Sequence, residues 1–253
     1  VNVISPSDFP NCRPMPGYPE IKLVINPARR LKCLIDDFKP DTIHIATEGP
    51  LGWAARRICL KRRWEFTTAY HTHFPDYVAL RAARHFPFLY KPVQSMCIAL
   101  IKYFHGPSSA VMTTTTSVEM TLRSWNFKAP LHRLTRGVKT DIFYPGSKTL
   151  FQDMKQPIAL YVGRVAIEKN IEAFLSMPWA GSKVIVGDGP SLPALKKRYP
   201  EAVFTGCKSG SDLADHFRSA DVFVFPSKTE TFGIVLIEAM ACGLPIAGYN
   251  VTG

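Results

Sequence analysis

Two glutamates near the end of the chain have the types and spacing that ligand binding would need. Glu230 and Glu238 are separated by seven residues. Glu238 lies within IVLIEAMAC (234–242), which is apolar except at this carboxylate and is followed by a glycine and a proline, so we expect a buried helix that ends there. Because burying a lone charge is costly, Glu238 should have a partner.

The spacing of Glu230 and Glu238 also indicates the shape of a ligand that could contact both carboxylates. At ~1.5 Å of rise per residue, the two carboxylates lie roughly 12 Å apart, with the free N–H groups of the helix start between them. Such a helix start binds phosphate. A nucleotide sugar, with hydroxyls at both ends and a diphosphate between them, would satisfy all three features. The alternative is structural, with Glu230 capping the helix and Glu238 in a salt bridge within the core.

The stretch 226–245 resembles the signature of the retaining family-four glycosyltransferases, PSxxETFGxxxxEAMAxGxP, in which two glutamates bracket seven residues. The resemblance implies that Glu230 holds hydroxyls of the donor sugar and that Glu238 holds the ribose. It also implies substrate contacts for the residues between them, which are Thr231, Phe232, Gly233 and Ile234.

A second segment, GRVAIEKN (163–170), resembles the GRxxxEKN pattern of the same family. Arg164 and Lys169 lie at a loop and a helix start, where two cations can neutralise a diphosphate as charge develops on the leaving group. The resemblance assigns them this catalytic task, with Gly163 beside the substrate. Outside this context, an arginine and a lysine five residues apart would be interpreted as surface charges.

The turn VGDGP (186–190) resembles the GxGP loop that the family places near the nucleotide, so Gly187 and Gly189 are expected to bind substrate. A single short glycine loop is weak evidence by itself. The chain contains no Walker motif and no full dinucleotide fingerprint.

A histidine is expected at the carboxyl end of a strand in the first half. The strand FTTAY (66–70) leads into HTHFPDY, and ligands of open α/β sheets bind at such strand ends. Family members carry a histidine here that faces the donor sugar, and this role is carried over to His71 alone. The alternative is a histidine that is hydrogen-bonded within a loop. His73 and Asp76 are weaker candidates for a place near an acceptor.

Alternating strands and helices must position these groups. In the first half we expect strands at 2–5, 42–46, 66–70 and 110–113, an extended piece at 20–27, and helices at 28–38, 49–63 and 93–104. Thr116 and Glu119 form a capping-box pattern that predicts the start of a further helix. RGVKTDIFYPG (136–146) resembles the family's connection between domains, GVDTDxFxP, although Lys139 stands where an acidic residue is usual.

The second half alternates more plainly. Strands are expected at 158–162, 183–187, 202–206 and 221–225, with a strand-like segment at 244–248; the helices are expected from 168, at 192–198, at 212–219 and after 233. This order predicts a parallel, Rossmann-like sheet. The expected fold class is therefore α/β, and the resemblance implies two Rossmann-like domains of GT-B type with a cleft between them. We expect residues 1–146 to form the acceptor-side domain and residues 147–253 to form the nucleotide-sugar domain, and we expect each domain to be truncated at its outer end.

Charge is unevenly distributed between these two parts. The chain has a net charge of +11; up to Gly146 it has 20 Lys and Arg against 10 Asp and Glu, and the remainder has 11 against 10. Basic residues alternate with aromatic ones at 56–64 and 81–104, a mixture that suits an anionic membrane surface, a nucleic acid or a solvated face. A nucleic-acid-binding module would rest on this charge alone, and no nucleic-acid partner is expected.

Six scattered cysteines without a C-x-x-C pair favour a reducing cytosol over a disulfide scaffold. No apolar run reaches the ~18 residues of a membrane span, and no signal segment is recognisable. The expected location is therefore cytoplasmic, with peripheral association at the inner membrane face as an extension of that hypothesis. Neither a metal site nor a cofactor is expected.

The resemblance implies a retaining, metal-independent glycosyltransferase that moves a hexosyl group from a nucleoside diphosphate sugar to a sugar or lipid acceptor. HTHFPDY also resembles the mannosyltransferase-like subgroup that glycosylates membrane lipids, which favours a lipid. No side chain stands out as a covalent nucleophile. The alternatives are a nucleotide-sugar epimerase or a phosphorylase-like enzyme of the same fold, or the basic nucleic-acid-binding module.

Overall fold

The computed structural model describes residues 1–250 except 17, 72–73, 84–85, 229 and 231. The chain divides into two compact units, Val1–Thr135 and Arg136–Gly253. This division comes before the boundary at Gly146 that the sequence suggests. The connecting segment packs with the second unit because Phe143 is buried in that unit's core.

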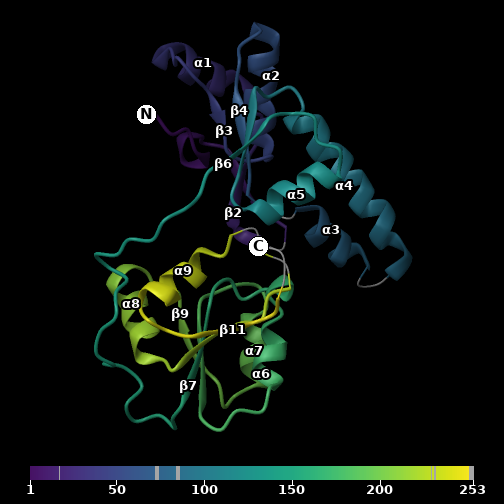
Figure 1. Ribbon diagram of the computed structural model, residues 1–253. Coiled ribbons are helices and arrows are strands. Elements are labelled where there is room, and N and C mark those ends of the chain that lie inside the picture. The colour runs from purple at the N-terminus through teal and green to yellow at the C-terminus, as the bar shows by residue number, and fades with distance from the viewer. Residues whose placement is uncertain (17, 72–73, 84–85, 229, 231, 251–253) are drawn as a thin grey trace. The chain divides into compact units, whose positions relative to one another are not determined.

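A parallel sheet organises the first unit (Figure 1). Among the described residues it has four strands in the order β3-β4-β5-β6, namely β3 His44–Ile45, β4 Thr67–Tyr70, β5 Ala110–Thr113 and β6 Leu131–Arg133. A separate antiparallel hairpin joins β1 Cys12–Met15 to β2 Tyr18–Val24. The helices are η1 Pro6–Asp8, α1 Ala28–Phe38, α2 Pro50–Arg62, α3 Phe74–Ala83, η2 Pro87–Leu89, α4 Tyr90–His105 and α5 Thr116–Ser124.

Two local predictions in this unit were wrong. The strand expected at 2–5 does not form; instead the Ser5 amide donates to the Asp8 carboxylate at 2.7 Å and starts the turn η1, because Pro6 at its first position favours a helical turn. The cap of α5 is Thr115, one residue before the predicted Thr116, since its hydroxyl accepts from the Val118 amide at 3.2 Å.

The second unit contains a parallel sheet with the strand order β11-β10-β7-β8-β9 among the described residues. Its strands are β7 Ile158–Val162, β8 Ser182–Val186, β9 Val203–Gly206, β10 Val222–Phe225 and β11 Ile246–Gly248. From β7 the chain proceeds outward through β8 and β9 and then returns to β10 on the other side. The junction of β7 and β10 is thus a topological switch point, where open α/β sheets bind ligands.

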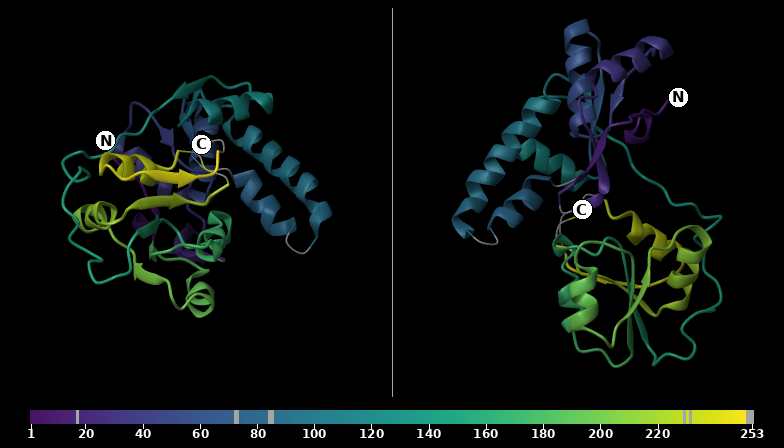
Figure 2. Two further views of the ribbon diagram at one scale, coloured as in Figure 1. Left: turned by 60° about the horizontal axis from the view of Figure 1, so that its bottom comes forward. Right: turned by 180° about the vertical axis from the view of Figure 1, so that it is seen from behind.

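Helices cover both faces of this sheet (Figures 1 and 2). They are η3 Ile167–Lys169, α6 Ile171–Ser176, α7 Leu192–Arg198, α8 Gly210–Ser219 and α9 Ile234–Ala241. Side chains of the fully buried strand β7 alternate between two cores: Ile158 and Leu160 face α8 and α9, whereas Ala159 and Tyr161 face α6 and α7. An apolar strand buried on both sides is typical of a doubly wound sheet.

The expectation that the apolar helix after Gly233 is buried was wrong. Within α9 only Ala239 is fully buried, and Ile234 and Met240 are exposed. One side of the helix packs against α8 and the sheet, which leaves the apolar residues on its other sides partly accessible. Glu238 is consequently half-buried instead of enclosed.

Candidate functional site

The switch point places two loops of the predicted site next to each other. β7 and β10 are parallel neighbours, with Ala159 opposite Val222, so their carboxyl ends lie at the same edge of the sheet. The loop after β7 contains residues 163–170, and the loop after β10 contains residues 226–233. The Asn170 side chain donates from Nδ2 to the Pro226 carbonyl at 3.0 Å and ties the two loops together.

Lys169 and Glu230 form an ion pair across these loops. Lys169 Nζ donates to Glu230 Oε2 at 2.8 Å, and the two side chains are only 20% and 15% exposed. Limited solvent access makes such a pair stronger than one on the surface and fixes both side chains. The cation expected at a diphosphate and the carboxylate expected at a sugar are therefore in direct contact.

Tyr161 supports the start of the loop after β7. Its ring is buried and its hydroxyl donates to the Arg164 carbonyl at 2.8 Å. Burial raises the pKa of Tyr161, and the nearby carboxylates of Glu230 and Glu168 raise it further. The phenol therefore stays protonated and remains a hydrogen-bond donor that fixes the backbone beside Arg164, whose side chain is half-buried.

The glycine turn after β8 fits against this loop so closely that side chains are excluded. A Cβ atom at Gly187 would lie 1.9 Å from the Gly163 carbonyl oxygen, and one at Gly189 would lie 2.4 Å from that of Val165. Both glycines also have positive φ angles, 142° and 155°. The Val165 amide donates to the Asp188 carbonyl at 2.8 Å, so the two loops form one framework at the edge of the sheet.

The helix α9 begins at the same edge of the sheet, directly after the loop that contains Glu230. Its N-cap is Gly233 in a left-handed conformation, which offers no side chain to the free N–H groups of the first turn. Ile234 is the first helical residue, and Phe232, half-buried, precedes the cap. Thr231 lies outside the described residues.

Glu238 lies one turn further along α9. Burial raises the pKa of its carboxyl group. Within the part of the chain that the structure describes, this carboxylate has no hydrogen-bond or ion-pair partner, so neither the salt bridge of the structural alternative nor the partner expected from the sequence is formed there. Its acceptor oxygens remain available to a donor from outside the protein.

In the first unit, the predicted site residue His71 also lies at the carboxyl end of a parallel strand. His71 directly follows β4 and is half-buried. Asp76, one of the weaker acceptor candidates, instead ties α3 to α4, since it accepts from Gln94 Nε2 at 2.7 Å and from the Tyr90 hydroxyl at 3.3 Å. His73 lies outside the described residues.

Sequence reasoning missed the contacts that assemble the site. It assigned Lys169 and Glu230 to different parts of a ligand and did not anticipate their ion pair. It also gave no role to Asn170, whose left-handed backbone at the end of η3 directs its amide to the opposite loop. The signal was present in the strand order: if β7 and β10 had been expected at a switch point, the loops after them would have been expected to meet.

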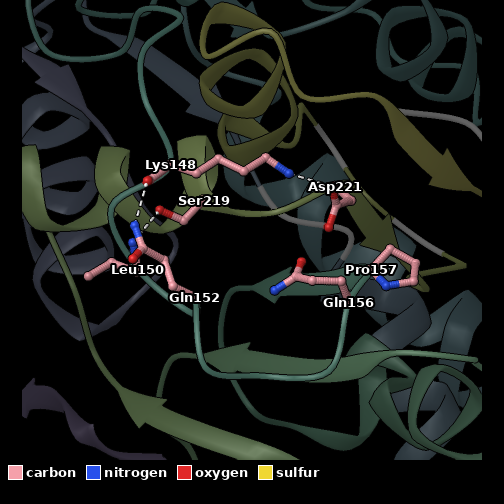
Figure 3. A pocket seen from close by; sticks show the side chains of 7 residues that line it. All are labelled: Lys148, Leu150, Gln152, Gln156, Pro157, Ser219 and Asp221. Carbon is pink, nitrogen blue, oxygen red and sulfur yellow. Dashed lines mark hydrogen bonds and ion pairs between the residues drawn. The ribbon is translucent and has the colours of Figure 1, made fainter.

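A cavity of about 630 Å³ lies elsewhere in the second unit (Figure 3). It is lined by Lys148, Leu150, Gln152, Gln156, Pro157, Ser219 and Asp221. These residues precede β7 and β10, so the cavity is at the opposite edge of the sheet from the glutamates. Its polar groups serve the chain itself, because Asp221 accepts from the Ile158 amide at 2.6 Å and pairs with Lys148, and Ser219 accepts from the Leu150 amide at 3.0 Å.

Two kinds of feature are absent from the described residues. No helix described there is long and apolar enough to cross a membrane. Nor does the described part contain a group of three or more His, Cys, Asp or Glu side chains that could hold a metal ion.

Comparison with known proteins agrees with this geometry. Residues 7–142 match the sequence model described as Glycosyltransferase Family 4, and residues 156–253 match that of the Glycosyl transferases group 1. The chain belongs to glycosyltransferase family 4. Its two parallel α/β units are those of the GT-B type.

The relatives act on different substrates. The chain is 30% identical to the sulfoquinovosyl transferase SQD2 of Arabidopsis thaliana over 95% of its own length and 48% of that protein. It is 31% identical to a GDP-mannose-dependent alpha-mannosyltransferase of Mycolicibacterium smegmatis, covering 90% and 60%, and 27% identical to the alpha-monoglucosyldiacylglycerol synthase of Streptococcus pneumoniae, covering 84% and 52%. The chain thus spans about half to three fifths of these relatives.

Solved structures give the same fold. The sucrose-phosphate synthase of Thermosynechococcus elongatus superposes with a TM-score of 0.71 at 25% identity, covering 88% of this chain and 59% of that one. Anabaena HepE in complex with UDP-glucose superposes with a TM-score of 0.66 at 17% identity, covering 88% and 64%.

Proposed function

We propose that this protein transfers a hexosyl group from a nucleoside diphosphate sugar to an acceptor hydroxyl. The observation that carries the proposal is the 2.8 Å pair between Lys169 and Glu230 at the switch point. An ammonium group suits phosphate, and a carboxylate suits sugar hydroxyls. Because one ion pair holds both, a ligand that contacts them must carry its sugar directly next to a phosphate, as a nucleotide sugar does.

The cationic part of the site would stabilise the leaving group. As the bond between sugar and diphosphate breaks, negative charge grows on the diphosphate. Lys169, held by its ion pair, and the uncapped start of α9 offer positive charge and N–H donors in fixed positions, which lowers the energy of that charge without reorganisation. Arg164 is proposed to add a second cation from the loop after β7. These groups can do this without a bound metal, and metal independence is part of the proposal.

Glu238 is proposed to hold the ribose. Its carboxylate is half-buried, burial raises its pKa, and no described protein group donates to it. The two ribose hydroxyls can donate to the two carboxylate oxygens, and such hydrogen bonds would offset the cost of burial. The same contact would fix the nucleoside end of the donor.

Retention is proposed to occur by attack from the same face that the diphosphate leaves, without a covalent intermediate. A nucleophilic carboxylate must be free to approach the anomeric carbon. Glu230 is the acid nearest to the expected sugar, but its Oε2 is engaged by Lys169. This engagement favours a role in holding hydroxyls over a role as nucleophile. His71, at the carboxyl end of β4, is proposed as a sugar-binding residue of the first unit.

The experiment is a donor screen on the full-length protein. Purified protein is incubated with UDP- and GDP-sugars, and release of nucleoside diphosphate is measured with and without acceptor. The anomeric configuration of the product is read by proton NMR. We expect release with at least one donor and an α product from an α-linked donor. An isomerised sugar nucleotide as the sole product would instead identify an epimerase.

A membrane lipid is the proposed acceptor. Relatives include a sulfoquinovosyl transferase and an alpha-monoglucosyldiacylglycerol synthase, and α4 carries a surface that suits a bilayer. Met96, Leu100 and Tyr103 recur at helical spacing on one side of α4 and are 64%, 46% and 65% exposed. On its other side the helix is anchored in the unit by buried Cys97 and Ile101.

The α3–α4 hairpin (Figure 2) also exposes apolar side chains at η2, directly before α4. Phe86 and Phe88 are exposed there, with ring centroids 6.0 Å apart. Residues 74–105 contain four Lys and Arg against one acidic residue. A net positive charge in a segment that exposes apolar side chains favours an anionic leaflet, where each cation near the surface contributes about 1 kcal/mol. We therefore propose peripheral binding of this hairpin to the cytoplasmic face of a membrane.

Vesicle binding tests the surface separately from the chemistry. Sedimentation with phosphatidylglycerol vesicles at low salt should exceed sedimentation with phosphatidylcholine vesicles, and Phe88→Ser combined with Met96→Ser should abolish it. Met120→Ser, which removes an equally exposed side chain from α5, is the control and should have no effect. Failure of the wild-type protein to bind phosphatidylglycerol would refute the membrane assignment.

A further inference from the structure

A carboxylate of the first unit lies at the same sheet edge as His71. β3 and β4 are parallel neighbours, with Ile45 opposite Thr68. Glu48 follows Ile45 by three residues, and His71 follows Thr68 by three residues. Both therefore leave adjacent strands at the carboxyl edge of the sheet, where ligands of α/β folds bind. Glu48 was not singled out in the sequence.

Glu48 is held in position by a contact with a buried histidine. His105 at the end of α4 is fully buried, and its Nε2 lies 3.0 Å from Glu48 Oε1, while the Glu48 side chain is 27% exposed. The imidazole packs against the rings of Tyr70, Phe104 and Phe127 at centroid distances of 6.2, 4.9 and 5.9 Å. The ring therefore has little freedom to change its orientation.

The hydrogen bonds around His105 determine which ring nitrogen donates. The Ser108 hydroxyl donates to the His105 carbonyl at 2.6 Å, so Ser108 Oγ accepts from the Thr68 hydroxyl at 3.3 Å. The Thr68 hydrogen is then used, and Thr68 Oγ1 must accept from His105 Nδ1 at 2.8 Å. This orientation of the imidazole leaves Nε2 facing Glu48 Oε1, so the ring fixes the position of that carboxylate oxygen.

This chain of hydrogen bonds holds the Glu48 carboxylate at the carboxyl edge of the sheet, where a ligand would bind. A core needs no such network, because apolar side chains of similar volume fill the same space at less cost in desolvation. Here the network begins at the buried Ser108 and ends at a partly exposed carboxylate beside α2. Only Oε1 is engaged by His105, so the other carboxylate oxygen can accept from a hydroxyl group at the sheet edge.

We propose that Glu48 is an acceptor-binding carboxylate, held in place by His105, which accepts a hydrogen bond from a hydroxyl of the acceptor. The assignment rests on the proposed function, in which the first unit receives the acceptor. The shared chemistry is an alcohol hydroxyl, whether it belongs to a membrane lipid or to a free polyol. His105 acts through Glu48 and is a positioning residue.

The test compares acceptor kinetics with acceptor-independent kinetics in the full-length protein. Glu48→Gln keeps the shape of the side chain and removes its charge, and Glu48→Asp keeps the charge and shortens the reach. Asp36→Asn is the matched control, because Asp36 is also an ion-paired carboxylate of the first unit but lies near the end of α1. The acceptors are diacylglycerol in detergent micelles, phosphatidylinositol in the same micelles, and free myo-inositol.

For Glu48→Gln we expect at least a tenfold fall in kcat/KM for the acceptor that the wild-type protein uses, mainly through a higher acceptor KM. The donor KM and the slow hydrolysis of donor without acceptor should stay within twofold of the wild type. Glu48→Asp should give an intermediate loss, and Asp36→Asn none. His105→Gln should also raise the acceptor KM, and in addition lower the melting temperature.

Two outcomes would overturn the assignment. Acceptor kinetics of Glu48→Gln within twofold of the wild type would show that the carboxylate does not bind acceptor. A parallel fall in acceptor-dependent transfer and in donor hydrolysis would show a structural role only. If the wild-type protein released no nucleoside diphosphate from any donor, the proposed function would fail first, and this assignment with it.

Discussion

Glu238 offers a prediction in which stability and ligand binding change in opposite directions. The carboxylate is half-buried in α9 without a described partner, and burial raises its pKa. Glu238→Gln keeps the size of the side chain and removes the charge. Since the group is only half-buried, the folded protein should gain about 1 kcal/mol at neutral pH, because an uncharged amide costs less to bury than a carboxylate. This corresponds to a rise in Tm of about 2–4 °C.

The sign of the pH dependence follows from the direction of the pKa shift. A carboxyl group whose pKa is higher in the folded state binds more protons when folded, so its unfavourable contribution appears as the pH rises above the ordinary value of 4.5. The advantage of Glu238→Gln in Tm should therefore be present at pH 7 and disappear below about pH 4.5. Ala241→Gly, in the same helix, provides a control for a change in α9 that removes no charge.

Whereas Glu238→Gln should raise the stability of the protein, it should lower its affinity for nucleotide. Two ribose hydroxyls that donate to a carboxylate contribute about 1.5–3 kcal/mol in total, so Glu238→Gln should weaken binding of free nucleoside diphosphate by roughly 10- to 150-fold. Differential scanning fluorimetry gives the Tm and isothermal titration calorimetry gives the Kd. A stabilised variant with unchanged Kd would refute the ribose contact, and a destabilised variant would refute the reasoning about burial.

The remaining predictions concern the two loops at the switch point. Glu230→Gln should reduce turnover by two or more orders of magnitude and lower the Tm by about 2–4 °C, because it removes a ligand contact and also weakens the ion pair with Lys169; steady-state kinetics and fluorimetry measure both. Arg164→Ala should lower kcat more than it raises the donor KM, since diphosphate charge grows only as the sugar leaves, and a rise in KM alone would argue against this. Asn170→Ala should lower kcat about tenfold by freeing one loop from the other, and Asn170→Asp, which cannot donate to the Pro226 carbonyl, should resemble it; parental rates in both would contradict the role of this contact.

The sequence predicted the architecture of the second unit well because its strands are uniformly apolar and are separated by clear turn signals. The strand 158–162 and the helix 192–198 were placed correctly to the residue. The pattern failed where local hydrogen bonds outweigh propensity, as at Ser5 and Asp8, and where apolar composition was interpreted as burial, as in α9. Composition gives the polarity of a helix, but which sides are covered depends on the elements that pack against it.

The candidate site was only partly predictable. Motif resemblance located Glu230, Lys169 and the glycine turn, but the contacts between them depend on strand order, which consecutive spacing along the chain does not reveal. The pairing of Glu48 with His105 joins positions separated by 57 residues, and neither belongs to a recognisable motif. The assigned roles of His71, Arg164, Glu230 and Glu238 stay predictions until variants are measured.

The central claim is that Lys169 and Glu230 act as one unit on adjoining parts of the donor. A double-mutant cycle with Lys169→Met, Glu230→Gln and the double variant tests it directly, with kcat/KM for the donor as the readout. Residues that act as a unit give non-additive losses, so the double variant should be no more than a few-fold worse than the poorer single variant. Losses that multiply in the double variant, or a single variant with parental kcat/KM, would contradict the account.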